Sequence, residues 1–83
     1  MNVTVRCYGP AKDLVGADEV RVELAEPVTA ADVLLVLAEE HERLRPILGT
    51  CALAVGDEIV GADGCIEPSL AHDVALLPPV AGG

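Results

Sequence analysis

The sequence predicts an α+β fold in which one main helix packs on one face of a mixed β-sheet. Two runs near the N-terminus alternate apolar and polar residues, one longer segment carries apolar residues at helical spacing, and short apolar runs follow it. A sheet with one apolar face and a helix with one apolar stripe bury these surfaces against each other. We therefore expect a two-layer domain.

Residues 3–8 and 19–24 are the first two predicted strands. In both runs apolar residues occupy every second position and alternate with polar or charged residues, as in half-buried strands. Between them, residues 11–15 are expected to form one helical turn that Gly16 ends. Because the two strands are close in sequence, we expect them to pair as an antiparallel hairpin-like unit.

Residues 30–44 are the predicted main helix. Thr29 is the expected N-cap, and Asp32 follows three residues later in the position of a capping box. Arg45-Pro46 is expected to end the helix, because the residue before a proline avoids the helical region. The apolar face predicted for this helix consists of Val33, Leu34, Leu37, Ala38 and His41.

Three further strands are predicted at residues 51–55, 59–60 and 74–77. Gly56-Asp57 indicates a turn between the first two, and residues 68–70 indicate a short turn before the last. The order of strands around one helix resembles the β-grasp fold of ubiquitin. With 83 residues and no repeat or linker, the whole chain (1–83) is expected to be a single β-grasp domain.

Charge and composition exclude several functional classes. The chain has 14 acidic and 5 basic side chains and a net charge of −9, the opposite sign to that of nucleic-acid binders and of proteins that bind anionic membranes. The N-terminus begins as a strand rather than a signal segment, and the longest apolar run, 33–38, is too short to span a bilayer. We expect no nucleic-acid or membrane partner and a cytoplasmic location.

The three cysteines and two histidines show no spacing typical of a metal site. Cys7, Cys51 and Cys65 form no CxxC pair, and His41 and His72 lack companion ligands. We expect no metal and no bound cofactor. Cys7 alternates with inward-facing valines and is expected to be a small buried residue, whereas the reactivity of the other two thiols depends on their exposure and pKa.

The C-terminus is the most informative segment. Pro78 and Pro79 lack backbone N–H groups, so the last strand should stop near Leu77, and residues 78–83 should form a protruding flexible tail. Gly82-Gly83 has no Cβ, which allows the backbone to pass through a narrow channel. A packed body with a bare terminal carboxylate is typical of a part that inserts into another protein.

Residues 74–83, which end in Pro-Pro-Val-Ala-Gly-Gly, resemble the terminus of the MoaD-type sulfur carriers, the small subunits of molybdopterin synthase. Residues 8–16 resemble the segment after the first strand in this family, with Lys12-Asp13 in place of the usual Arg-Glu pair. Two features depart from the family pattern. The turn at residues 71–73 is shorter and lacks a glycine, and leucines replace the aromatic residues that usually precede the two prolines.

The resemblance implies a chemistry centred on Gly83. An ionised carboxylate is a poor acyl electrophile and has to be activated first. A ubiquitin-activating-type enzyme would use ATP to adenylate Gly83, a sulfur donor would form the thiocarboxylate, and the sulfur would pass to a pterin precursor in molybdenum cofactor biosynthesis. The implied partner is the large subunit of molybdopterin synthase, in a heterotetramer. The chain itself would have no catalytic residue beyond the Gly83 carboxylate.

The same resemblance assigns the tail to binding in the partner. By alternation, Val74 and Leu76 share one face of the last strand, and Leu77 lies on the other. Leu77 is therefore either an exposed docking anchor or an ordinary core residue, and we expect the anchor. The residues assigned to the partner channel and docking surface are Gly82, Ala81, Val80, Pro79, Pro78 and Leu77.

Other functions remain open from the sequence. A ThiS-like carrier for thiamine or cysteine synthesis would use the same chemistry at Gly83 with another acceptor. A ubiquitin-like modifier would form isopeptide bonds with lysines. A pure binding module would be indifferent to the terminal carboxylate.

Overall fold

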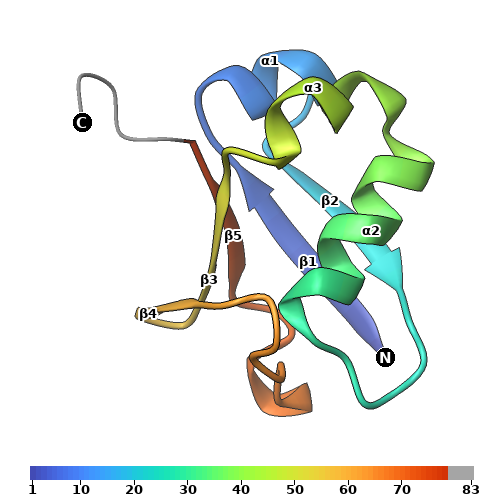
Figure 1. Cartoon of the computed structure of the whole chain (residues 1–83), viewed down its shortest axis with the longest axis vertical. Helices are drawn as coiled ribbons and strands as arrows, with labels where there is room; N and C mark the ends of the chain where they lie inside the picture. Colours follow the sequence, from blue (N-terminus) through green and yellow to red (C-terminus); the bar gives the residue numbers. More distant parts are fainter. Residues whose placement is uncertain (79–83) are drawn as a thin grey trace.

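The computed structural model describes residues 1–78, which fold into one five-stranded mixed sheet covered on one face by helices (Figure 1). The strands are β1 (Asn2–Cys7), β2 (Glu19–Glu23), β3 (Ala52–Val55), β4 (Glu58–Val60) and β5 (Val74–Leu77). The helices are α1 (Pro10–Val15), α2 (Ala30–Glu40) and α3 (Arg45–Leu48), with 3-10 turns at Glu42–Leu44 and Pro68–Leu70. This is the predicted α+β class, in a β-grasp, ubiquitin-like arrangement.

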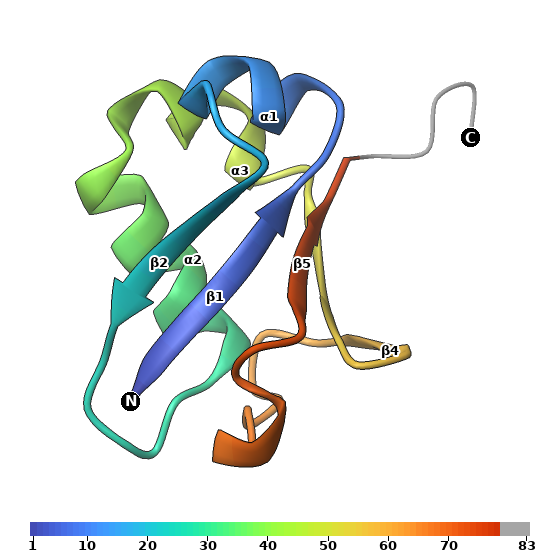
Figure 2. The same cartoon turned by 180° about the vertical axis from the view of Figure 1, so that it is seen from behind.

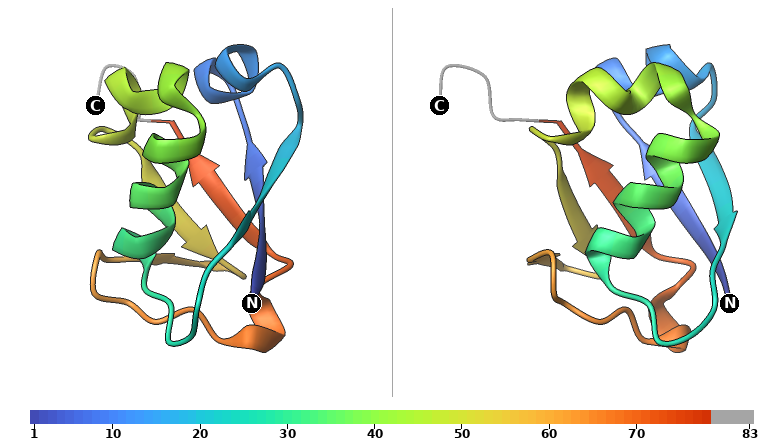
Figure 3. Two further views of the ribbon diagram at one scale, coloured as in Figure 1. Left: turned by 90° about the vertical axis from the view of Figure 1, so that its right-hand side faces the viewer. Right: turned by 45° about the vertical axis from the view of Figure 1, so that its right-hand side comes forward.

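The strands lie in the order β2-β1-β5-β3-β4. The predicted antiparallel pairing of β1 with β2 is confirmed, and β1 also pairs in parallel with β5. β3 is antiparallel to both β5 and β4. The helices gather on one face, as the side views in Figure 3 show, and the opposite face of the sheet is seen in front in Figure 2.

Alternation places one row of each strand against the helices. Val3, Val5 and Leu76 are fully buried on this face, and Leu37 of α2 packs over them in the same core. Each such side chain contributes about 1.5–3 kcal/mol by leaving water. Among residues 1–78 no buried side chain is polar or charged, so the described core is held by shape and apolar area alone.

The predicted start of α2 is confirmed in detail. The Thr29 hydroxyl accepts a hydrogen bond from the backbone N–H of Asp32 at 3.2 Å, and the Asp32 carboxylate accepts one from the N–H of Thr29 at 3.0 Å. This capping box satisfies two backbone donors that the first turn leaves free. It fixes where α2 begins and therefore which of its faces meets the sheet.

The predicted end of α2 at Arg45-Pro46 is wrong. α2 stops at Glu40, His41 leaves helical geometry with φ −126° and ψ 76°, and Arg45–Leu48 forms a separate short helix. A proline is tolerated in the first turn of a helix, where its missing N–H has no partner. The Nε of Arg45 donates to the carbonyl of Ala38 at 2.6 Å, so the basic residue closes the end of α2 from outside it. His41, predicted on the apolar face, is instead the C-cap of α2.

The remaining elements agree with the sequence to within a residue or two. α1 ends at Gly16, which adopts the left-handed conformation with φ 73°. β3 begins at Ala52 rather than at residue 51, and β5 has the predicted bounds. Within the described part of the chain, each helix falls short of the length and apolar character needed to cross a membrane.

Candidate functional site

The central strand of the sheet leads directly into the C-terminal segment. β5 lies between β1 and β3, so its backbone is paired on both sides as far as Leu76, and Leu77 is paired with β3 alone. Leu77 at that end pairs with Ala52, the first residue of β3. The chain therefore leaves the sheet from its central strand, which has a neighbour on each side.

The structure describes two residues of the predicted site, Leu77 and Pro78, and both lie where the chain leaves β5. Leu76 is fully buried, whereas Leu77 is half-buried on the opposite face, which confirms the face predicted for each by alternation. Pro78 is also half-buried and ends the strand, as predicted. The other residues assigned to the site lie outside the described residues, namely Pro79, Val80, Ala81, Gly82 and Gly83.

A glycine turn after β1 packs beside Pro78. Gly9 has φ +55° and ψ −130°, a conformation that is almost restricted to glycine. A Cβ built on Gly9 would lie 3.7 Å from the Cγ of Pro78, so the turn and the proline are in contact. In the sequence, the Gly9-Pro10 pair indicated a turn but gave no sign that this turn would contact Pro78.

The outer face of β3, β4 and β5 is apolar next to Leu77. Ala54 lies opposite Ala75 on one side and Ile59 on the other, and Ala52 lies opposite Leu77, so these side chains share one face. The alanines are half-buried and Ile59 is 69% exposed. We call the set Ala52, Ala54, Ile59, Ala75 and Leu77 the outer-face patch.

The outer-face patch was missed in the sequence, apart from Leu77. In β3 both faces are apolar, with Ala52 and Ala54 alternating with Leu53 and Val55. A run of this kind carries no polar residue that would mark its exposed side. The small size of the alanines is the one available signal, since the alternating leucine and valine fill the core.

A shallow hollow lies on the β1–α1 side of the exit. It has a volume of about 400 Å³ and is lined by Arg6, Cys7, Tyr8, Gly9, Lys12, Asp18 and Glu19. Lys12 Nζ lies 2.8 Å from Asp18 Oδ1, and this hydrogen bond raises the pKa of Lys12. Both side chains are largely exposed, at 55% and 82%, so the pair adds little to stability. Tyr8 is 45% exposed at the rim.

The thiols behave as their burial dictates. Cys7 is buried, as predicted, and its burial raises its pKa, with a further contribution from Cys51. Cys51 is half-buried, and its burial also raises its pKa, whereas Cys65 is exposed. Thiols with a raised pKa are weak nucleophiles at neutral pH. Across residues 1–78 the histidines, cysteines and carboxylates form no group of three that could hold a metal ion.

Comparison with known proteins gives a consistent result. A model of the ThiS family matches residues 5–83. The chain is 25% identical over 83 residues to the molybdopterin synthase sulfur carrier subunit of Chlamydomonas reinhardtii, covering 100% of both chains. It is 28% identical over 83 residues to the protein of the same name from Caenorhabditis briggsae, covering 100% of this chain and 99% of the relative.

Solved structures show the same fold. Subunit 1 in the complex of subunits 1 and 2 of the molybdopterin-converting factor from Helicobacter pylori matches with a TM-score of 0.65 and 28% identity, covering 100% of both chains. Small archaeal modifier protein 1 of Haloferax volcanii matches with a TM-score of 0.79 at 20% identity, covering 95% of this chain and 98% of that one. The second likeness bears on the fold alone. With a family model matched over residues 5–83 and full-length relatives named as sulfur carriers, the chain belongs to the MoaD/ThiS family.

Proposed function

We propose that the chain is the sulfur-carrier subunit of a molybdopterin synthase and that Gly83 carries the sulfur. In this proposal an ATP-dependent activating enzyme adenylates the Gly83 carboxylate, and a sulfur donor displaces AMP to leave a thiocarboxylate. The large subunit of the synthase then receives residues 78–83 in a channel, where the sulfur passes to a pterin precursor. We place this chemistry in the cytoplasm.

One observation carries the proposal. The Pro-Pro-Val-Ala-Gly-Gly terminus continues directly from the central strand of a MoaD/ThiS-family body. Both relatives described above share the name of a molybdopterin synthase sulfur carrier over the full chain. The Helicobacter pylori homologue was solved in complex with subunit 2 of its molybdopterin-converting factor, which supports a large-subunit partner here.

The body contributes position rather than acid–base chemistry in this mechanism. Docking through the outer-face patch would hold Leu77 and Pro78 at the mouth of the channel. The reactive terminus is then tethered a few residues from the docked body. This tether gives the terminus an effective concentration in the channel of roughly millimolar or higher. Gly82 and Gly83 have no side chain to obstruct the channel. The partners supply the phosphate site and the pterin pocket.

The proposal is tested by mass spectrometry of the intact protein after incubation with the activating enzyme, ATP and a sulfide source. We expect the mass shift of one sulfur replacing one oxygen, and transfer of that sulfur when large subunit and pterin precursor are added. A Gly83-deleted chain should show neither. Ile59→Glu should keep the fold and weaken binding to the large subunit by about tenfold or more. Full activity of the deleted chain in the reconstituted synthase would rule out this mechanism.

Two other members of the same chemical class remain candidates. The match to the ThiS family supports a carrier for thiamine synthesis, which would deliver its sulfur to a thiazole-forming enzyme instead of a pterin. A protein modifier, which the sequence also leaves open, would give isopeptide adducts on lysines. The mass spectra and the acceptor that takes up the sulfur separate these three functions.

A further inference from the structure

β2 is an edge strand whose outer side is unpaired in the described structure. The sheet order ends with β2, and β1 is its one neighbour. Leu24 exchanges two hydrogen bonds with Met1, at 3.0 and 2.7 Å, and Asp18 accepts one from Cys7 at 2.8 Å. These bonds fix the alternation of the antiparallel ladder.

The alternation determines which backbone groups face outward. Since Leu24 and Asp18 bond to β1, so do Val20 and Val22 in the same register. The N–H and C=O groups of Glu19, Arg21 and Glu23 therefore point away from β1. None of these three residues takes part in the hydrogen bonds between elements of residues 1–78, so a row of donors and acceptors is free for another strand.

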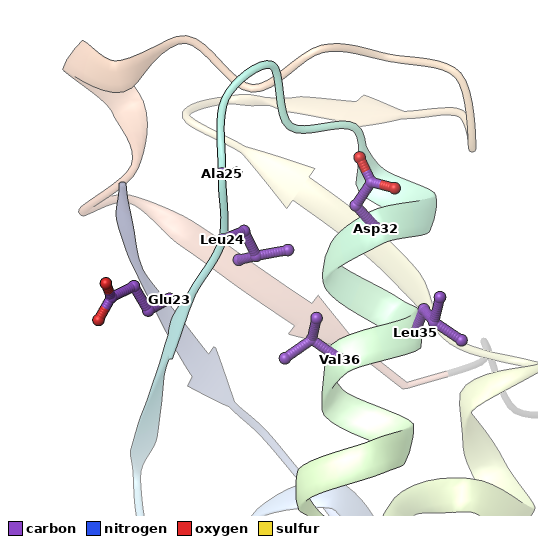
Figure 4. A pocket seen from close by; sticks show the side chains of 6 residues that line it. All are labelled: Glu23, Leu24, Ala25, Asp32, Leu35 and Val36. Carbon is purple, nitrogen blue, oxygen red and sulfur yellow. The ribbon is translucent and has the colours of Figure 1, made fainter.

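An apolar groove runs beside this edge, between β2 and α2. It has a volume of about 300 Å³ and is lined by Glu23, Leu24, Ala25, Asp32, Leu35 and Val36. Figure 4 shows that Leu24, which directly follows β2, and Val36 of α2 point toward each other across the groove. Leu35 is 61% exposed, so it adds accessible apolar surface to the lining of the groove. An added strand would place every second side chain in this groove.

The charges around the edge specify what kind of strand fits. Glu19, Arg21 and Glu23 share the outer face of β2, and Asp32 closes the groove at the start of α2. Cross-strand neighbours of opposite charge stabilise a pair of strands, whereas like charges destabilise it. The complementary strand therefore carries basic residues opposite Glu19 and Glu23, an acidic residue opposite Arg21, and apolar residues between them.

The same charges disfavour a second copy of this chain as the occupant. Full antiparallel overlap of two β2 strands about Arg21 would set Arg21 against Arg21 and Glu19 against Glu23. Both kinds of contact join like charges. A partner with the opposite pattern avoids them.

We propose that the β2 edge and its groove form a second interaction surface, which binds an extended segment of a partner protein by strand addition. The segment alternates apolar residues, which enter the groove, with basic residues, which face Glu19 and Glu23. The surface lies at the edge of the sheet opposite β4, with β1 between β2 and the β5 exit (Figure 2). It can therefore be occupied while the outer-face patch and the tail are engaged, and it does not depend on the proposed function.

The experiment titrates the isotope-labelled full chain with a blocked peptide containing Val-Lys-Val-Glu-Val-Lys-Val, followed by NMR and hydrogen exchange. This sequence reads the same in both directions, so it tests parallel and antiparallel addition together. We expect shift changes along residues 19–25 and at Leu35 and Val36. We also expect the outward amides of Arg21 and Glu23 to become protected, while the amide of Val22, already bonded to β1, changes little.

Matched variants separate this surface from the docking surface of the proposed function. Leu35→Glu should weaken peptide binding by about tenfold or more and leave thiocarboxylate formation at Gly83 unchanged. Ile59→Glu is the matched control, because it also replaces an exposed apolar residue by glutamate but lies in β4, at the opposite edge of the sheet. It should leave peptide binding unchanged. Arg21→Pro removes an outward N–H without touching the β1 ladder and should also abolish binding. A peptide with the charges exchanged should bind several-fold more weakly.

Several results would overturn the proposal. Absence of shift changes at residues 19–25, or equal binding by wild type and Leu35→Glu, would exclude the surface. Binding without protection of Arg21 and Glu23 would exclude strand addition. Self-association of the free chain that Leu35→Glu abolishes would identify a second copy, rather than a partner segment, as the occupant.

Discussion

Gly9 and Gly16 bracket α1, and both have a positive φ, of +55° and +73°. They differ in ψ, which is −130° at Gly9 and 22° at Gly16. The second conformation is the left-handed one that other residues adopt at a moderate cost, whereas the first is almost restricted to glycine. Gly9 also contacts Pro78 at the exit of β5, while a Cβ on Gly16 would meet nothing within 4 Å.

We expect Gly9→Ala to lower the free energy of unfolding by about 2–3 kcal/mol and Gly16→Ala by about 1 kcal/mol. The difference measures the backbone conformation, because alanine adds the same methyl group at both positions. Urea unfolding followed by circular dichroism gives both values. If both variants lost the same free energy of unfolding, the backbone conformation at Gly9 would be no more restricted to glycine than the conformation at Gly16.

Single residues also show where the sequence was sufficient. The opposite faces of Leu76 and Leu77 followed from alternation, and the burial of Cys7 from its place among inward valines. The contact between Gly9 and Pro78 could not be predicted, because these residues lie at opposite ends of the chain. Local pattern gives the direction of a side chain, and only the fold gives its neighbour.

The main helix is specified at its start more strongly than at its end. The capping box of Thr29 and Asp32 marks the start through two side chains that are local in sequence. The end depends on Arg45, which reaches back to the Ala38 carbonyl from a separate helix. A proline after the helical pattern indicated a stop but not its position, because Pro46 fits the first turn of α3.

We expect Thr29→Ala to destabilise the protein by about 1 kcal/mol, the usual cost of losing an N-cap side chain. Asp32→Ala should cost a similar amount, and the double variant should cost less than the sum, since each side chain bonds the backbone of the other. Chemical unfolding of the three variants tests the coupling. Strict additivity would mean that the two hydrogen bonds act independently.

At alkaline pH, the stability of the whole molecule should fall as the pH rises, because two of its thiols are at least partly buried. Burial raises the pKa of Cys7 and of Cys51 above the ordinary thiol range, so the folded protein keeps these protons longer than the unfolded chain. The unfolded chain binds fewer protons above about pH 8.5, and the free energy of unfolding therefore falls as pH rises further. Below that pH the full contribution is present.

We expect the free energy of unfolding to decrease between about pH 8 and pH 10, and to decrease less in a Cys7→Ala, Cys51→Ala double variant. The quantity to compare is the slope of the free energy of unfolding against pH. Its absolute value is no guide, because the double variant loses core packing and is less stable at every pH. Cys65→Ala serves as the control, since this thiol is exposed. The same slope in all three proteins would show that the buried thiols do not set the alkaline limit.

At the scale of the whole molecule, the sequence predicted the order of elements and the β-grasp class but not the surfaces. The strand and helix patterns are local, so their sum gave the layers. The parallel pairing of β1 with β5 joins the two ends of the chain and leaves no local mark. The outer-face patch and the β2 groove arise only when segments far apart in the sequence lie side by side, and periodicity carries no information about such neighbours.

The central position of β5 also determines how the molecule bears mechanical load. A partner that grips the chain beyond Leu77 and pulls along the strand stresses the ladders to β1 and β3 together. Because the pull acts along β5 and the ladder hydrogen bonds run across it, both ladders are loaded in shear, and several hydrogen bonds have to yield together. We therefore expect the body to resist a pull on its C-terminus better than a pull that peels the edge strand β4 from β3.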